Sequence, residues 1–299
     1  MSLLAQLNVR SASGTRPQKA ALSDDLFEQL RSFIYDQTGI YFQDNKRYLL
    51  ESRVGRRMQA LNLPDYGAYL RYLNQPAGRA ELPKLYDEIT INETYFFRNT
   101  DQFSVLEQTL IPELAEERMK GPRRQVRIWS AACSTGDEPY TLALIIRERL
   151  QPRFPGIRFE IVGTDINTQV LDVARAGIYS AYAVRNVPPA TLQRYFRQEG
   201  DRYHLDPEIR RMVTFKHLNL MDRSGMALMR HFDIILCANV LIYFDTASKQ
   251  QVVSSLYASL NPGGFLMLGF SETLYGISQA FQPVRFEKTI AYKRGTSHA

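Results

Sequence analysis

The sequence is poor in cysteine and histidine. Its 299 residues contain two cysteines, Cys133 and Cys237, and four histidines that show no HExxH-type spacing. Two cysteines are too few for a disulfide framework or a four-ligand metal site, so we expect both to be buried apolar residues. The sequence therefore predicts no metal site, and a reducing, cytoplasmic setting fits it best.

Long apolar runs are also missing. No stretch of about 18 apolar residues occurs, which argues against a membrane-spanning helix and against direct membrane insertion. Residues 1–21 have neither the apolar stretch nor the cleavage site of a secretory signal, and we expect a loose polar tail there. The net charge of +6 and the pI near 9.2 still allow an acidic partner, namely nucleic acid, an anionic membrane surface or an acidic protein.

Residues 22–90 show helical periodicity and are predicted to form an all-α domain. Ser23 is suited to begin a first helix and Gly39 to end it. A second helix is expected over residues 45–61, with cations flanking its apolar stripe. These cations are either a solvated helix flank or a docking surface, and they are Lys46, Arg53, Arg56 and Arg57.

After residue 120 the pattern changes to strands that alternate with helices, which is typical of a parallel sheet covered on both faces. A linker is expected at 91–101, followed by an α/β domain over 102–299 with a small inserted subdomain at about 178–211. The tail should add an antiparallel pair at the sheet edge. The strands are expected at 125–132, 159–165, 212–220, 232–240 and 265–270, the last after a turn at NPGG (261–264), and the pair lies within 281–294.

Polar residues follow three of these strands, at the sheet edge where open parallel sheets bind ligands. The loop after the first strand is neither a GxGxxG fingerprint nor a phosphate loop, and Asp137 and Glu138 would repel a pyrophosphate. Asp165, at the end of the second strand, is suited to bind ribose hydroxyls. Alternatively, Asp137 is a helix-start acid and Asp165 a helix cap. The combination favours an adenosine that carries a positive charge, as in S-adenosylmethionine.

Four segments carry a resemblance to a known family. NETYFFR (92–98), WSAACSTGDEPYT (129–141), GTDIN (163–167) and CANVLIYF (237–244) resemble the chemotaxis-receptor glutamate methyltransferases, the CheR family. The resemblance implies a Rossmann-like class I S-adenosylmethionine-dependent methyltransferase domain. Its sheet would be mostly parallel with an antiparallel C-terminal edge, and an N-terminal all-α domain and a small β-containing insert would complete the fold.

The resemblance also implies roles for single residues. The methyl group of S-adenosylmethionine would pass to receptor glutamates, giving glutamyl 5-O-methyl esters and S-adenosylhomocysteine. Tyr243 matches the tyrosine near the transferred methyl group, and Arg98, which matches an arginine of the cofactor site, is expected to orient the substrate carboxylate. The basic flank of the second helix is the expected receptor-docking face. The cofactor would be bound by Asn92, Thr94, Arg98, Glu138, Asp165, Asn219, Leu220, Ala238 and Asn239. Phe96 and Phe97 are expected to pack the linker against the catalytic domain.

The chain departs from the family pattern in two places. Ala238 stands where the family usually has arginine. If that arginine assists the substrate carboxylate, its role here is either absent or taken by Arg98 or another cation. The segment 197–205 lacks the glycine-rich extension of members that tether to a receptor C-terminal pentapeptide, and we expect a pentapeptide-independent enzyme.

Two other functions compete with this interpretation. A nucleic-acid amino-methyltransferase often carries Asp/Asn-Pro-Pro-Tyr/Phe after its fourth strand, but here that position reads ANVLIYF, so we expect no nucleic-acid partner. A catalytically weak adaptor that binds S-adenosylmethionine or its product is favoured only by Ala238. The expected partner is the cytoplasmic helical bundle of a methyl-accepting chemoreceptor, and we expect the chain to be a monomer.

Overall fold

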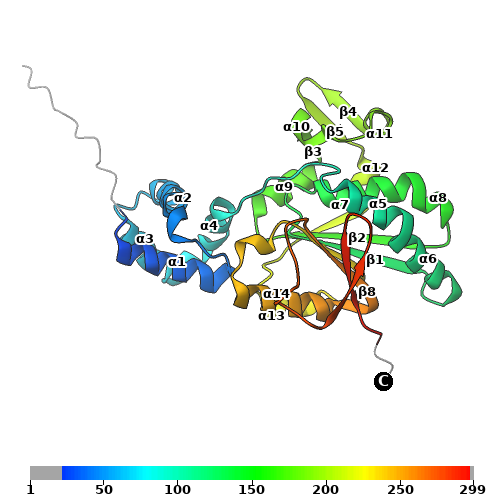
Figure 1. The fold of residues 1–299 in the computed structure, drawn as a ribbon. Helices are drawn as coiled ribbons and strands as arrows, with labels where there is room; N and C mark the ends of the chain where they lie inside the picture. Colours follow the sequence, from blue (N-terminus) through cyan, green and yellow to red (C-terminus); the bar gives the residue numbers. More distant parts are fainter. Residues whose placement is uncertain (1–21, 297–299) are drawn as a thin grey trace, which may run out of the picture.

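A computed structural model describes residues 22–296, so the tail expected at 1–21 lies outside the described residues. A helical domain, a larger α/β domain and a small β-containing subdomain are visible in Figure 1. None of the described helices is long and apolar enough to cross a membrane.

The helical domain begins where the sequence predicts. The Ser23 side chain accepts a hydrogen bond from the Leu26 backbone N–H, and Gly39 ends the first helix in the left-handed conformation with φ of 70°. Apolar residues spaced three and four apart bury one face of each helix in a shared core. The α-helices are α1 (Asp24–Thr38), α2 (Arg47–Ala60), α3 (Tyr66–Leu73) and α4 (Leu82–Ile89), and short 3₁₀ turns cover Asp44–Lys46 and Pro76–Ala80.

The main sheet has the strand order β6-β2-β1-β7-β8-β10-β9. The first five strands in this order run parallel, while β10 is antiparallel to both of its neighbours. The predicted fold class is therefore confirmed, including the antiparallel edge. The strands are β1 (Gln125–Ala131), β2 (Arg158–Asp165), β6 (Val213–His217), β7 (Phe232–Cys237), β8 (Leu260–Leu268), β9 (Phe281–Arg285) and β10 (Ile290–Arg294).

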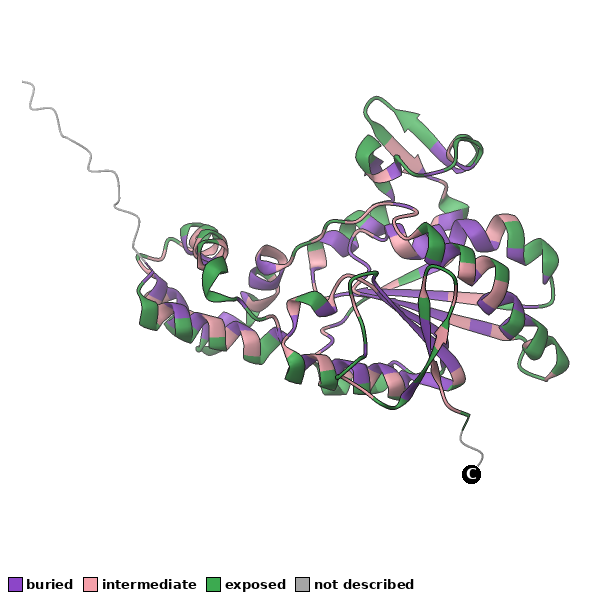
Figure 2. Cartoon of the chain, in the orientation of Figure 1, coloured by how far each residue is buried: buried purple, intermediate pink, exposed green. Residues whose placement is uncertain are grey.

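Helices cover both faces of the sheet, and the central strands are buried between them (Figures 1 and 2). On β1, Ile128 packs into one apolar cluster and the adjacent Trp129 into another, so successive side chains serve opposite faces. The flanking helices are α5 (Thr100–Val105), α6 (Ile111–Lys120), α7 (Asp137–Ile145), α8 (Gln151–Arg153), α9 (Thr168–Ala176), α13 (Arg223–Leu228) and α14 (Thr246–Ser259), with π-helical turns at Leu106–Leu110 and Ile146–Leu150 and a 3₁₀ turn at Leu241–Tyr243.

The segment between α9 and β6 forms the small subdomain at the top of Figure 1. Its three strands pair antiparallel in the order β3-β5-β4. Its elements are β3 (Ile178–Ser180), α10 (Ala181–Val184), α11 (Pro189–Tyr195), β4 (Phe196–Glu199), β5 (Arg202–Leu205) and α12 (Pro207–Arg210).

The strand ends differ from the sequence expectation in three places. The third and fourth strands end at His217 and Cys237, earlier than predicted, because the chain leaves the sheet there. The last parallel strand instead begins at Leu260 and runs through NPGG, which was expected to be a turn. These residues are accommodated by a register shift against β7, where Phe232 pairs with Leu260 but Ile234 pairs with Phe265.

Candidate active site

One cavity lies at the carboxyl ends of β6, β2, β1 and β7, which are neighbours in the sheet. Residues 38–53 of the helical domain and residues 89–99 between the two domains complete its wall. This is the edge at which open parallel sheets bind ligands. The cavity brings together all ten of the cofactor and catalytic residues predicted from the sequence: Asn92, Thr94, Arg98, Glu138, Asp165, Asn219, Leu220, Ala238, Asn239 and Tyr243.

The loop after β1 is shaped by left-handed backbone at Ala132, Ser134 and Gly136. Its conformation is fixed by Asp165, whose carboxylate accepts the Ser134 backbone N–H at 2.8 Å and the Asn167 N–H at 2.9 Å. Asp165 is buried, and burial raises the pKa of its carboxyl despite these hydrogen bonds. Asp165 therefore organises the loop as well as lining the cavity.

Glu138 and Asp137 begin α7 but have different surroundings. Glu138 lines the cavity and accepts a 2.7 Å hydrogen bond from the Ser130 hydroxyl. Burial raises its pKa to about 7, and the cationic Arg98 opposes this rise. Asp137 does not line the cavity: it is fully buried and accepts a 2.5 Å hydrogen bond from the Thr135 hydroxyl. Its position agrees with the helix-start interpretation.

The two phenylalanines of NETYFFR anchor the segment between the domains. Phe96 is fully buried, and its ring centroid lies 4.8 Å from that of Tyr179 and 5.2 Å from that of Phe196. Both partners belong to the small subdomain, and the Phe96 N–H also donates to the Ala183 carbonyl at 3.0 Å. Phe97 has φ of 56° and packs against the same core, so both side chains pack as predicted.

The polar residues of the same segment make hydrogen bonds around the cavity. The Asn92 side-chain amide donates to the Thr90 hydroxyl at 3.2 Å, and the Asn92 carbonyl accepts from the Ser134 hydroxyl at 3.0 Å. The Arg98 guanidinium donates to the Glu93 carbonyl at 2.6 Å. These contacts hold the backbone while leaving Asn92 and Arg98 in the cavity wall.

The opposite wall is formed after β6 and β7. The Asn219 amide donates to the Gln37 carbonyl at 2.7 Å, so this residue also ties the helical domain to the sheet. Tyr243 is half-buried, and burial raises the pKa of its hydroxyl while Arg98 and Arg53 lower it. Its carbonyl accepts a hydrogen bond of 3.0 Å from the Tyr41 N–H of the helical domain.

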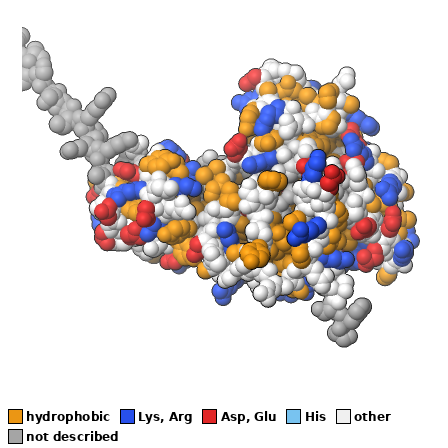
Figure 3. All heavy atoms as spheres, viewed as in Figure 1, with side chains coloured by type: hydrophobic (Ala, Val, Ile, Leu, Met, Phe, Trp, Pro, Cys, Tyr) orange, Lys and Arg blue, Asp and Glu red, His pale blue; other side chains and the backbone are white. Residues whose placement is uncertain are grey.

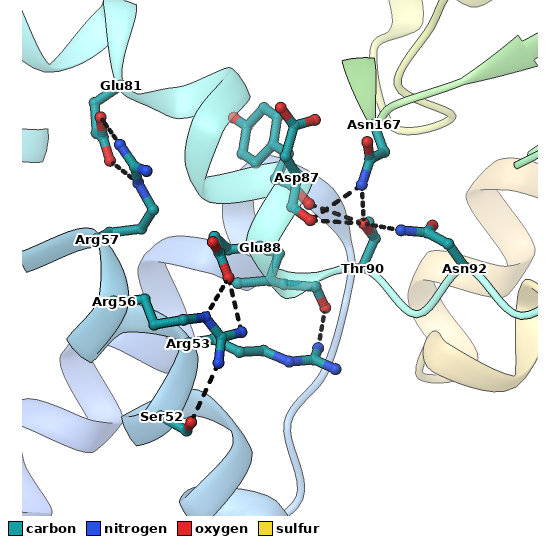
Figure 4. Close-up of polar contacts among 12 residues, drawn as sticks. Ser52, Arg53, Arg56, Arg57, Glu81, Asp87, Glu88, Thr90, Asn92 and Asn167 are labelled. Atoms are coloured by element: carbon teal, nitrogen blue, oxygen red, sulfur yellow. Dashed lines mark hydrogen bonds and ion pairs between the residues drawn. The ribbon is translucent and has the colours of Figure 1, made fainter. Parts of the chain in front are cut away.

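The predicted docking cations differ in their surroundings: Lys46 lies in the turn before α2, and Figure 4 shows Arg53, Arg56 and Arg57 of α2 with different partners. Lys46 and Arg53 line the cavity, and Arg53 also donates to the Ile89 carbonyl. Arg56 is exposed and pairs with Glu88 at 2.7 Å. Arg57 turns inward and makes two hydrogen bonds, of 2.7 and 3.0 Å, to the buried Glu81. Arg57 is therefore less accessible to a partner than Arg56, because Glu81, just before α4, draws its side chain inward.

A polar network missed by the sequence analysis joins the two domains (Figure 4). The Asp87 carboxylate accepts from the N–H of Thr168 at 2.6 Å and from its hydroxyl at 2.8 Å, at the start of α9. The Asn167 amide donates to the Thr90 hydroxyl at 2.7 Å. Since Thr90 also holds Asn92, this network links the domain interface to the cavity wall. No local sequence signal marks Asp87 or Thr90, whereas Ser134 lies within a motif already noted.

The chemistry of the lining residues fits S-adenosylmethionine. A buried carboxyl such as Glu138 gains from binding an ammonium group, and Asp165 ends the strand at which ribose hydroxyls are bound in folds of this type. Fold and cavity together define a class I S-adenosylmethionine-dependent methyltransferase.

Comparison with known proteins identifies the family. Residues 92–290 match the model described as "CheR methyltransferase, SAM binding domain", and residues 25–90 match "CheR methyltransferase, all-alpha domain". The chain belongs to the CheR methyltransferase family.

Similar proteins cover most of the chain. Chemotaxis protein methyltransferase 2 of Vibrio cholerae is 37% identical over 272 residues, which are 91% of this chain and 93% of that protein. Chemotaxis protein methyltransferase of Vibrio parahaemolyticus is 39% identical over 91% of this chain and 98% of its own length. Chemotaxis protein methyltransferase 1 of Pseudomonas aeruginosa is 38% identical over 89% of this chain and 97% of its own length.

Proposed function

We propose that this methyltransferase acts in chemotaxis and methylates glutamate side chains in the cytoplasmic helical bundle of a methyl-accepting chemoreceptor. The products are glutamyl 5-O-methyl esters and S-adenosylhomocysteine. The observation that carries the proposal is the composition of the cavity, which is lined by the acids Glu138 and Asp165 and also by Arg98 and Tyr243. The acids suit the cofactor, and the cation and hydroxyl suit an incoming carboxylate. The names of the similar proteins support the same pathway.

The proposed reaction needs no general base. A glutamate side chain has an ordinary pKa of about 4.3 and is ionised near neutral pH. When bound, S-adenosylmethionine supplies a methyl group on a positive sulfur, and the carboxylate oxygen bonds to the methyl carbon as the carbon–sulfur bond breaks. The chain's contribution is orientation: Arg98 contacts the carboxylate, and Tyr243 steers it through its hydroxyl.

Arg98 can also take the role of the arginine that the family usually has at the position of Ala238. Arg98, Arg53 and Lys46 all line the cavity, so cations remain in its wall although residue 238 is alanine. Arg98→Ala is expected to slow methyl transfer roughly tenfold to hundredfold, the cost of losing a charge-assisted hydrogen bond, and to weaken cofactor binding much less. Equal loss of both would argue against this assignment.

Lys46, Arg53 and Arg56 are proposed as the receptor-docking cations, because they lie at or beside the cavity and an acidic bundle would attract them. Positive and negative side chains are mixed over the face shown in Figure 3. This face therefore has no broad basic surface of the kind that binds nucleic acid. The receptor KM should rise with salt, and Arg56→Ala should reduce this salt dependence. Arg175→Ala, another exposed arginine in an ion pair, is the matched control. Equal slopes for the two variants would count against docking.

The proposal keeps four further expectations from the sequence. The chain is divided at 22–90, 91–101 and 102–299, with the insert at about 178–211. It is monomeric and cytoplasmic. It does not need a receptor C-terminal pentapeptide, which receptor fragments with and without that pentapeptide would test: a fall in KM with the pentapeptide would overturn this part.

The deciding experiment measures transfer of labelled methyl from S-adenosylmethionine to a chemoreceptor cytoplasmic fragment, scored as base-labile methanol. Mass spectrometry then locates the esters. Label on receptor glutamates that is lost in Arg98→Ala and Asp165→Ala, with the folding of both variants checked by thermal unfolding, would support the proposal. Cofactor binding without transfer to any of a panel of receptors would favour the adaptor instead.

A further inference from the structure

The turn after β7, residues 239–243, forms part of the cavity wall and begins with a residue in the left-handed conformation. Asn239, Ile242 and Tyr243 all line the cavity. Asn239 has φ of 63°, in the left-handed region that residues other than glycine adopt uncommonly, although asparagine tolerates it better than most. Such backbone persists when surrounding groups hold it in place.

The support comes from Glu272, in the loop between β8 and β9. One of its carboxylate oxygens, Oε2, accepts the backbone N–H of Asn239 at 2.7 Å and that of Gly269 at 2.7 Å. The other, Oε1, accepts the N–H of Ile242 at 3.3 Å. Hydrogen bonds to an ionised acceptor are stronger than those between neutral groups. One side chain therefore holds both ends of the stretch from Asn239 to Ile242.

The far side of this turn is held by the helical domain. The Tyr243 carbonyl accepts the Tyr41 N–H, and Ile40 forms an isolated β-bridge with Phe244. Within the catalytic domain, Glu272 adds side-chain hydrogen bonds to the packing of Leu241 and Phe244, which are buried in the apolar core. Its oxygens accept backbone N–H groups of the turn, and its negative charge also contributes to raising the pKa of Glu138 and Tyr243, after the larger effect of burial.

We propose that Glu272 is a positioning residue for methyl transfer: its carboxylate sets the Asn239–Tyr243 turn and thereby the Tyr243 hydroxyl. The part concerning Tyr243 rests on the proposed function, whereas the part concerning Asn239 requires only cofactor binding.

Two substitutions separate these parts. In Glu272→Gln, the amide oxygen can take the place of Oε2 and keep the bonds to Asn239 and Gly269. Its NH₂ group then faces the Ile242 N–H, a donor against a donor, which displaces the Ile242–Tyr243 end. Glu272→Ala removes all three bonds and releases Asn239 as well.

We expect Glu272→Gln to lower kcat by roughly tenfold, the loss of about one hydrogen bond to a charged group, while the Kd for S-adenosylmethionine changes by less than about threefold. Glu272→Ala should also raise that Kd by about tenfold or more. Glu287→Gln, on an exposed residue between β9 and β10, is the matched control and should change neither quantity. Thermal unfolding identifies any variant that fails to fold.

A double-mutant cycle with Tyr243→Phe distinguishes positioning from general destabilisation. If Glu272 acts through the Tyr243 hydroxyl, Glu272→Gln should have little further effect on kcat in the Tyr243→Phe background. Fully additive losses would overturn that role. An unchanged Kd for S-adenosylmethionine in folded Glu272→Ala would overturn the support of Asn239, and this result does not depend on the receptor substrate. Absence of methyl transfer by the wild-type chain, with normal cofactor binding, would instead count against the proposed function.

Discussion

The inserted subdomain and the helical domain both contact the short segment of residues 90–98, the first by apolar packing and the second by hydrogen bonds. On the subdomain side, Phe96 packs between the rings of Tyr179 and Phe196. On the helical side, the Thr90 hydroxyl accepts a hydrogen bond from Asn92 of the segment, and Asp87 and Thr90 are themselves bonded to the start of α9. Apolar packing is strong but not directional, whereas hydrogen bonds fix orientation. The comparison suggests that the subdomain anchors the segment and the helical domain orients its cavity-lining residues.

The largest effect is expected on the apolar side. Phe96→Ala should lower the free energy of unfolding by about 3–5 kcal/mol, because it removes a fully buried ring from a packed core. Urea denaturation measures the change. Phe270→Ala, at a side chain that is 92% exposed, is the control and should cost less than about 0.5 kcal/mol. A cost below about 1 kcal/mol for Phe96→Ala would refute the anchoring role.

The second-largest effect is expected from the hydrogen bonds of the helical domain. Asp87→Ala should lower the free energy of unfolding by about 2 kcal/mol, because two donors of Thr168 lose a charged acceptor. It should also weaken S-adenosylmethionine binding, because freeing Thr168 loosens the neighbouring Asn167, which donates to the Thr90 hydroxyl that Asn92 contacts. Phe96→Ala should act mainly on stability. Calorimetric titration measures the affinity, and Asp36→Ala, on the exposed face of α1, is the control. If Asp87→Ala left the affinity for S-adenosylmethionine unchanged, the hydrogen bonds of the helical domain would have no special role in orienting the cavity-lining residues.

A pH dependence should arise in the cavity between these regions. Burial raises the pKa of Glu138 to about 7, so its carboxyl takes up a proton as the pH falls below that value. The protonated form no longer attracts an ammonium group, and the Kd for S-adenosylmethionine should rise by roughly tenfold from pH 7.5 to pH 6. Glu138→Gln should bind more weakly at pH 7.5 and lose this dependence. The same dependence in the Gln variant would exclude Glu138 as its source.

The smallest effect concerns the exposed ion pair of the helical domain. Arg56→Ala should lower the free energy of unfolding by about 0.5 kcal/mol, because its pair with Glu88 is partly screened by solvent. Arg57→Ala should cost several times more, since it leaves Glu81 buried without its cation. Unfolding of the two variants side by side checks the difference. Equal costs would contradict the inward placement of Arg57.

Much of the fold was predictable because it depends on local patterns. Ser23 and Gly39 bound the first helix, and alternating strands and helices indicated the parallel sheet. The cavity residues were predictable because four short motifs follow strand ends or lie between the domains, and those positions converge in this topology.

What could not be predicted depends on partners far apart in the chain. Arg57 meets Glu81, Asp87 meets Thr168, and Glu272 meets Asn239, and no periodicity within one helix or loop encodes such a meeting. The early start of β8 has a similar cause, because a register shift against β7 accommodates the NPGG residues within a strand.

The hydrogen bond from the Tyr41 N–H to the Tyr243 carbonyl has a consequence for engineering. The helical domain ends at residue 90 in sequence, yet its backbone contacts and supports the Asn239–Tyr243 turn of the other domain. A chimaera that takes its helical domain from a relative, in order to redirect the enzyme to another receptor, therefore also replaces the cavity-lining residues between 38 and 53. If the helical domain sets receptor choice, as proposed above, receptor choice and reaction rate would change together in such a chimaera, and one that keeps the rate has to keep the backbone conformation at Ile40 and Tyr41.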